Sequence, residues 1–138
     1  MPGPEPVLRM MADDRASAAL GIELVTAGEG SAHTRLTVRD DMVNGHDIAH
    51  GAVVFALADT AFACACNSWG PVTVAAGAQI EFLRPARRGD VLDAHATVRR
   101  RWGRQGVYDV TVVRGEDVVA EFRGRSTQLR SPAAGDAS

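Results

Sequence analysis

The chain has 138 residues, 46% of them hydrophobic, and a formal net charge of −2 at pH 7. This length fits one domain with a real hydrophobic core, so we expect a single domain over residues 1–138. The small negative charge argues against nucleic-acid binding, and no apolar run is long enough to span a membrane, so we expect a cytoplasmic protein. Met1 to Pro6 is rich in proline and Ser131 to Ser138 is small and polar, so order should run from about residue 7 to about residue 130.

The first third of the chain predicts one helix and two strands. Residues 8–20 have helical character and end at Gly21, which suits a helix C-cap. Residues 22–26 read as a short strand, and apolar and polar side chains alternate over residues 32–38, which is the period of a strand. A loop over residues 40–49 should then lead into the next helix.

The stretch that follows predicts a buried helix with unusual chemistry. From Gly51 to Cys66 nearly every side chain is small or apolar, which is typical of a core helix. Asp59 is the only charged residue in this run, and a buried carboxylate is costly unless it is paired, hydrogen-bonded or neutralised. His50 and Gly51 should form the first turn, where backbone N–H groups are free to bind an anion or a carbonyl oxygen. These features together indicate an active-site helix.

Everything after the helix reads as strand. Short turns, several of which contain glycine, separate four alternating segments, at residues 72–84, 91–99, 108–112 and 118–129. Consecutive strands joined by short turns favour a meandering antiparallel sheet, here in an α+β protein. Such a sheet would curl around the one helix apolar enough to fill it.

Several motifs in order resemble one family. Asn44-Gly45-His46, His50-Gly51 and the segment FALADTAFACACNS from Phe55 to Ser68 resemble the hotdog-fold acyl-CoA thioesterases, above all the phenylacetate-degradation (PaaI) type. The departure is Ala52, where the family usually has a second glycine. The resemblance implies a hotdog fold, a curved antiparallel β-sheet wrapped around one long central helix. It continues through Thr73-Val74-Ala75, Phe82-Leu83-Arg84-Pro85, Gly89-Asp90, Gly106-Val107-Tyr108-Asp109 and Ala120-Glu121-Phe122-Arg123-Gly124, and so spans most of residues 11–127.

The resemblance also implies a reaction and a set of site residues. The reaction is hydrolysis of an aryl-acyl-CoA thioester, such as (hydroxy)phenylacetyl-CoA, to the free acid and CoA, without a cofactor or a metal. The Gly51 N–H would polarise the thioester carbonyl, and Asp59 would act as general base or nucleophile. Asn44 would orient substrate or water, and His50 would lie beside the reacting groups.

Helix geometry predicts that this site is shared between two subunits. Gly51 and Asp59 are eight residues apart, which is roughly 12 Å along a helix. One helix therefore cannot bring both to the same carbon atom, whereas two antiparallel helices related by a two-fold axis can. We expect a homodimer with two sites, and further a dimer of dimers (homotetramer).

Each assignment has a simpler alternative. Asp59 could be a structural carboxylate hydrogen-bonded to the backbone or to Thr60. His46, Asp47 and His50 could be read as metal ligands, but no third histidine lies nearby. His50 could be only a cap, and Asn44-Gly45 could be only a turn.

The basic turn and the function also leave alternatives open. Arg84, Arg87 and Arg88 could hold the phosphates of CoA or could be a solvated turn. A hotdog acyl-CoA dehydratase and a non-catalytic acyl-CoA-binding protein are the competing functions. If the substrate ring carries a hydroxyl, the polar side chains available near the helix are those of Thr60, Asn67 and Ser68.

Overall fold

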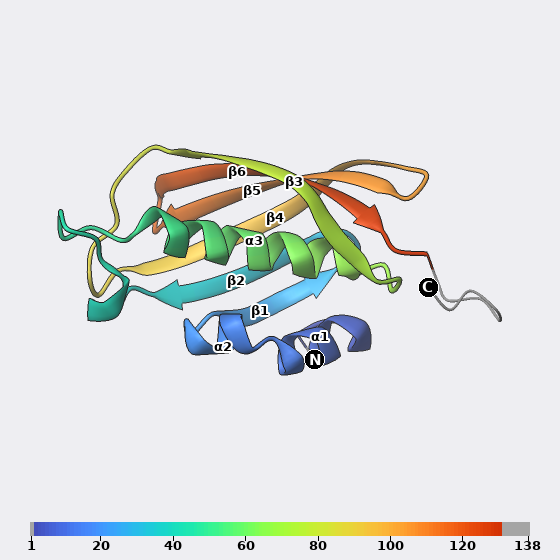
Figure 1. Ribbon diagram of the computed structural model, residues 1–138, viewed down its shortest axis with the longest axis horizontal. Helices are drawn as coiled ribbons and strands as arrows, with labels where there is room; N and C mark the ends of the chain where they lie inside the picture. Colours follow the sequence, from blue (N-terminus) through green and yellow to red (C-terminus); the bar gives the residue numbers. More distant parts are fainter. Residues whose placement is uncertain (1, 131–138) are drawn as a thin grey trace.

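The computed structural model describes residues 2–130, which form one antiparallel sheet and three α-helices. Figure 1 shows α3 lying along one face of the sheet, with α1 and α2 beside it on the side of β1. None of the helices in this part of the chain has the length and apolar character that a membrane span requires. The elements are α1 (Glu5–Asp13), α2 (Arg15–Ala19), β1 (Glu23–Gly28), β2 (Ser31–Thr37), the 3₁₀ turn η1 (Asp40–Met42), α3 (Gly51–Asn67), β3 (Thr73–Phe82), β4 (Val91–Trp102), β5 (Gln105–Arg114) and β6 (Asp117–Gln128).

The sheet has the strand order β1-β2-β4-β5-β6-β3, and every neighbouring pair is antiparallel. The alternation expected from the sequence is confirmed in β2, β4 and β5, where every second side chain is buried. The buried side chains of these strands face α3. The sheet therefore covers one side of a helix that is too apolar to be exposed to water. This is the α+β arrangement predicted from the sequence.

Aromatic contacts hold α3 against the sheet. The Phe62 ring lies 5.6 Å from the ring of Tyr108 and 5.8 Å from that of Phe122, between ring centroids. Gly124 permits this approach, because a Cβ atom there would lie 2.7 Å from the Phe62 ring. A larger residue at Gly124 would force the helix away from β6.

One flank of α3 is not covered by the chain itself. Leu57, Ala58, Ala61 and Ala65 are fully buried. By contrast, a stripe at spacings of four, three and four residues is half-buried or exposed, and it consists of Ala52, Ala56, Asp59 and Ala63. The helix is therefore buried on most of its surface but open along one line of small residues and a single carboxylate.

The N-terminal helix expected over residues 8–20 is in fact two helices. The first begins at Glu5, inside the segment expected to be unstructured, and ends at Asp13. Asp14 then caps α2, since its carboxylate accepts a hydrogen bond from the backbone N–H of Ser17 at 2.9 Å. A side chain that caps a new helix competes with continuation of the old one. The other terminal expectation, for residues 131–138, lies outside the described residues.

β3 forms an edge of the sheet and departs from the expected alternation. A bulge between Ala75 and Gly77 shifts the register against β6, so the even-numbered residues from Val72 to Phe82 do not share one face. Val72 and Val74 are exposed, and so are Phe82 and the following Leu83. A long, apolar, exposed edge strand is a surface that commonly pairs with another chain.

Candidate active site

The N-terminus of α3 presents one free backbone donor. His50 is the N-cap, and its Nδ1 accepts a hydrogen bond from the Ala52 N–H at 3.0 Å. The N–H of Gly51 stands at the first helical position, where no intrahelical acceptor exists. No acceptor for it is found in residues 2–130. The helix dipole adds partial positive charge at the same point, so Gly51 is suited to bind a developing oxyanion.

The cap also fixes the state of the His50 ring. A neutral imidazole that accepts at Nδ1 carries its proton on Nε2. The ring is exposed, so the Nε2–H is available to an incoming ligand. The geometry therefore confirms that His50 caps the helix, and the Nε2–H of the ring remains available for a second role.

A cavity of about 400 Å³ opens beside this helix terminus. Phe82 forms one wall and lies so close to Gly51 that a Cβ atom there would be 3.1 Å from its ring. A glycine is therefore the residue that lets the apolar wall and the N–H donor meet without displacement. The cavity is lined by Asn44, Ile48, Ala49, Gly51, Val54, Phe82, Leu83, Arg84, Pro85, Ala86 and Val119.

Asn44 combines a structural role with a free donor. Its Oδ1 accepts hydrogen bonds from the backbone N–H groups of His46, at 2.9 Å, and of Ile48, at 3.4 Å. These bonds close the loop that leads into α3. The side-chain oxygen of Asn44 therefore serves the turn, as the simpler alternative expected. The Nδ2 group has no acceptor among the described residues and belongs to a side chain that lines the cavity.

Asp59 lies on the open flank of α3 and borders a different cavity. This second cavity measures about 180 Å³ and lies between α2 and α3. No donor within residues 2–130 contacts the Asp59 carboxylate, so the alternative of a structural carboxylate bound to the backbone or to Thr60 finds no support there. Burial raises the pKa of Asp59 above its usual value, and the negative charge of Asp14 adds to the rise. An unpaired, partly desolvated carboxylate has the character of a general base.

The two halves of the site therefore do not meet within one chain. α3 is continuous from Gly51 to Asn67, so Asp59 is displaced from Gly51 by roughly 12 Å along the axis and roughly 80° around it. Gly51 and Asn44 line the first cavity, whereas Asp59 lines the second. Sequence spacing predicted this separation.

The three arginines of the basic turn differ in their surroundings. Arg84 lines the first cavity and donates to the Val118 carbonyl at 2.9 Å. Arg88 is held by two carboxylates, those of Asp47 at 3.1 Å and Asp40 at 3.6 Å. Arg87 is not among the residues that line the first or the second cavity. The structure thus brings only Arg84 of the three to the candidate site.

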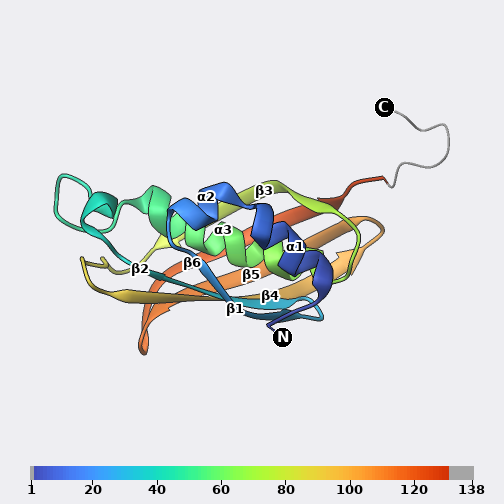
Figure 2. The ribbon, with the colours of Figure 1, turned by 90° about the horizontal axis from the view of Figure 1, so that it is seen from below.

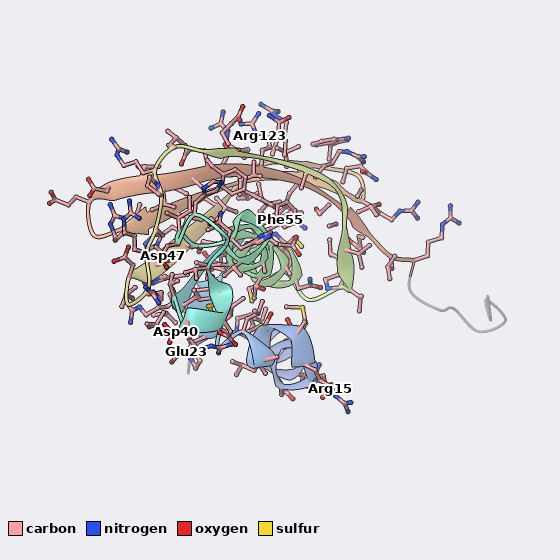
Figure 3. The ribbon with its side chains drawn as sticks, turned by 60° about the vertical axis from the view of Figure 1, so that its left-hand side comes forward. Arg15, Glu23, Asp40, Asp47, Phe55 and Arg123 are labelled. Atoms are coloured by element: carbon pink, nitrogen blue, oxygen red, sulfur yellow. The ribbon has the colours of Figure 1, made fainter. Side chains whose placement is uncertain are left out.

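Figure 3 shows two other charged residues in different surroundings. Arg123 projects from the face of the sheet opposite α3, away from the candidate site, and binds Asp109 on β5 at 2.6 Å. Asp47 lies on the loop beside the N-terminus of α3, the loop that Asn44 organises.

The geometry of the described residues supports neither a nucleophilic cysteine nor the alternative of a metal site. Cys64 and Cys66 are buried and free, and burial raises the pKa of each thiol to about 12. A thiol that stays protonated is a poor nucleophile. Within residues 2–130, no cluster of three histidine, cysteine, aspartate or glutamate side chains is arranged to hold a metal ion.

Two features of the site were missed in the sequence. Asp14 and Ser17, from the short α2, form the far wall of the cavity that contains Asp59. Phe82 and Leu83 belong to one of the motifs that carry the family resemblance, but the sequence did not indicate that they would line the candidate site. An aspartate three residues before a serine is a recognisable helix-start signal, whereas nothing local indicates that this start would pack on Thr60.

Comparison with known proteins identifies the class that this fold and site define. The Thioesterase superfamily profile matches residues 46–121, and the chain belongs to that superfamily. The hotdog fold and the thioester hydrolase class expected from the sequence are thereby confirmed.

Individual relatives are close over nearly the whole chain. The chain is 44% identical to the acyl-coenzyme A thioesterase PaaI of Escherichia coli over 129 residues, which covers 93% of this chain and 92% of that protein. The structure of the E. coli PaaI protein from the phenylacetic acid degradation operon superposes with a TM-score of 0.90 at 43% identity, over 92% of this chain and 93% of that one. A mutant of the phenylacetic acid degradation protein PaaI from Thermus thermophilus gives a TM-score of 0.81 at 35% identity, over 84% of this chain and all of that one (100%).

Proposed function

We propose that the protein hydrolyses aryl-acyl-CoA thioesters, in particular (hydroxy)phenylacetyl-CoA, to the free acid and CoA. The observation that carries the proposal is the chemistry of α3, which presents a free N–H at Gly51 and an unpaired carboxylate at Asp59. The acyl-CoA substrate and the phenylacetate context are supported by the names of the relatives in E. coli and T. thermophilus. CoA thioesters are intracellular metabolites, so the proposed location is the cytoplasm.

The proposed mechanism assigns one role to each group. The Gly51 N–H binds the thioester oxygen and stabilises its charge as water adds to the carbonyl carbon, an effect worth about 2.7–4 kcal/mol for one such donor. Asp59 takes the proton of the attacking water, a contribution of about 10²–10⁴-fold. The carbon–sulfur bond then breaks, and the proton on Asp59 passes to the departing CoA thiolate. The amide of Asn44 and the Nε2–H of His50 donate to the substrate from the same side as Gly51.

Direct attack by Asp59 is the alternative to base catalysis. A single turnover in ¹⁸O-labelled water distinguishes the two routes. General base catalysis places the label only in the product acid. Label in the Asp59 carboxylate, left when water attacks the aspartyl carbonyl of an acyl–aspartyl anhydride, would demonstrate nucleophilic attack.

We propose that the complete site forms in a homodimer. The stripe of Ala52, Ala56, Asp59 and Ala63 is open and narrow, and small residues let a second helix approach closely. The exposed edge of β3 offers backbone groups for a partner strand. An antiparallel pair of α3 helices would bring the Gly51 of one subunit to the Asp59 of the other, twice in each dimer. Two such dimers would form the proposed homotetramer.

Arg84 is the proposed contact for the phosphates of CoA. It stands at the edge of the cavity that Gly51 and Asn44 line, and the guanidinium retains donors beyond the one given to Val118. A fork of N–H groups at the mouth of a cavity suits a phosphate that remains near solvent.

Release of free thiol tests the function. The measurement is kcat/KM for hydroxyphenylacetyl-CoA, phenylacetyl-CoA and a medium-chain acyl-CoA, followed with a thiol-reactive dye. We expect turnover, with the aryl thioesters preferred. Binding without thiol release would favour the acyl-CoA-binding alternative. Loss of water from a 3-hydroxyacyl-CoA without thiol release would favour the dehydratase, and a medium-chain preference would remove the phenylacetate assignment.

A further inference from the structure

Of Thr60, Asn67 and Ser68, the three polar side chains expected near the acyl part of a substrate, only Thr60 has a hydrogen-bonding position left open by the described residues. The amide of Asn67 donates to the carbonyls of Ala63 and Thr73, both at 2.9 Å, and accepts from the Thr73 N–H at 2.9 Å. The hydroxyl of Ser68 donates to the Ala65 carbonyl and accepts from the Gly30 N–H, both at 2.7 Å. Both side chains are therefore used to fasten the C-terminal end of α3.

Thr60 is different because it ends a directed chain of hydrogen bonds. The Ser17 hydroxyl donates to the Asp14 carboxylate at 2.6 Å and lies 2.9 Å from the Thr60 hydroxyl. A carboxylate only accepts, so the single proton of Ser17 points to Asp14. The Ser17 oxygen must then accept the proton of Thr60. Thr60 thus has its proton committed and its remaining lone pair open, and no described residue donates to it.

The open lone pair belongs to a side chain that lines the cavity containing Asp59. That cavity measures about 180 Å³, and its other polar lining groups are the Ser17 hydroxyl and the carboxylates of Asp14 and Asp59. A protein cavity of about 150 Å³ is sufficient for benzene, so a single aromatic ring fits here. Thr60 and Asp59 are adjacent on α3, which places the acceptor beside the proposed base. The walls are Asp14, Ala16, Ser17, Leu20, Ala56, Asp59, Thr60 and Ala63.

We propose that Thr60 accepts a hydrogen bond from a hydroxyl on the acyl group of the substrate, with Ser17 and Asp14 as the residues that position it. The inference rests on the proposed function and names the ligand chemistry of the same site, a hydroxylated aryl-acyl thioester. Ser17 fixes the direction of the Thr60 proton, and Asp14 fixes that of Ser17. An unsubstituted ring would leave the Thr60 oxygen without a donor, and a buried acceptor left unpaired costs binding energy.

The experiment compares substrates within each variant. The quantity measured is the ratio of kcat/KM for ortho-, meta- and para-hydroxyphenylacetyl-CoA to kcat/KM for phenylacetyl-CoA. Because the ratio is internal to one protein, a general loss of activity cancels. We expect the wild-type protein to favour at least one hydroxylated isomer. Thr60→Val, which replaces the hydroxyl with a methyl group of similar size, should lower that ratio by about tenfold, the worth of one uncharged hydrogen bond.

Three further variants test the chain of hydrogen bonds that runs from Asp14 through Ser17 to Thr60. Thr60→Ser keeps a hydroxyl and should retain most of the preference. Ser17→Ala leaves the Thr60 proton free to turn toward other acceptors, and it should therefore lower the ratio severalfold. Ser126→Ala removes another buried serine, on β6, whose hydroxyl bonds to the Gly106 carbonyl, and it should keep the wild-type ratio.

The outcomes separate this inference from the proposed function. If no thioester in the series releases thiol, the proposed function fails. If all are hydrolysed but the wild-type ratio is near one for every isomer, the inference is overturned and the function stands. An unchanged ratio in Thr60→Val would overturn it as well, and an unchanged ratio in Ser17→Ala would remove the positioning role of Ser17.

Discussion

The two groups of candidate site residues along α3 differ in hydrogen-bonding character. At the N-terminus the groups are donors: the Gly51 N–H and the Asn44 amide line the first cavity, and the exposed His50 Nε2–H stands at the helix cap. Two turns along, the second cavity offers acceptors: the carboxylates of Asp59 and Asp14 and the oxygen of Thr60 (Figure 2 shows α2, which carries this wall, lying against α3). Thioester hydrolysis needs one donor and one base at the same carbon atom. On the proposed mechanism, a chain that keeps donor and base apart would contribute one half of each of two shared sites.

The largest effect should come from removing the base. Asp59→Asn should lower kcat at least about 10²-fold, because the amide cannot take a proton from water. Its stability should change in the opposite direction. The folded pKa of Asp59 is raised, so the free energy of unfolding falls as the pH rises from the unfolded-state pKa to the folded one and stays lower above it. A neutral amide at this position would remove that cost. We therefore expect Tm at pH 7 to rise by on the order of a few degrees.

Two measurements check this prediction. Thiol release gives kcat, and a thermal melt at pH 7 gives Tm. The same melt repeated at acidic pH, where Asp59 is protonated in the wild type, should show a smaller difference between the two proteins. A folded Asp59→Asn protein with wild-type turnover would exclude Asp59 from the mechanism.

The donor end should respond less strongly to loss of one group. Asn44→Asp keeps the oxygen that accepts from the His46 N–H but removes the NH₂ donor. We expect kcat/KM to fall by about tenfold to a hundredfold, since a donor to a developing charge contributes about 1.5–3 kcal/mol. Asn44→Ala also loosens the loop and should show a lower Tm. If Asn44→Asp is as active as the wild type, Asn44 serves the turn alone.

His50 allows the cap and the free donor to be measured separately. His50→Ala leaves the Ala52 N–H without its acceptor and should destabilise the fold by about 0.5–2 kcal/mol. His50→Ser restores a cap but has no Nε2–H, so it should recover stability while kcat/KM stays severalfold below the wild type. Chemical denaturation and thiol release on the same preparations check both. Full activity in His50→Ser would reduce His50 to a cap.

The smallest effect concerns the coupling between the two carboxylates at the acceptor end. The charge of Asp14 contributes to the raised pKa of Asp59, after burial. Asp14→Asn should therefore lower that pKa, and the acidic limb of the kcat/KM–pH profile should move to lower pH. Asp13→Asn is the matched control, since Asp13 is the neighbouring carboxylate and is not among the causes of the shift. Coincident profiles for Asp14→Asn and the wild type would contradict the coupling.

Sequence patterns predicted the parts of the fold that depend on long uniform signals. The apolar run after His50 gave the bounds of α3 to within a residue, because nothing in it favours a break before Asn67. The strand rows of β2 and β4 followed from alternation. The chemistry of the helix singled out Gly51 and Asp59, and the resemblance supplied Asn44. The roles of all three remain predictions.

Features that depend on tertiary contacts could not be predicted in this way. The break at Asp14 reflects competition between a helix and its cap, and the contact of Ser17 with Thr60, 43 residues apart, accompanies it. The difference between Arg84 and Arg88 arises because the loop with Asp47 folds back onto Arg88. No local pattern carries either fact.

Sharing of the site between subunits is the central claim, and complementation tests it most directly. Gly51→Pro deletes the N–H donor at a helix position that accepts proline, and His50 already has the extended backbone that a residue before proline requires. Gly51→Ala adds the same Cβ beside Phe82 but keeps the N–H, and it should retain much more activity. Each of Gly51→Pro and Asp59→Asn should be nearly inactive alone. Unfolded and refolded together in equal amounts, they should recover about a quarter of the wild-type activity, because half of the dimers are mixed and each mixed dimer has one intact site. No recovery, with mixed dimers demonstrated by native mass spectrometry, would contradict a shared site.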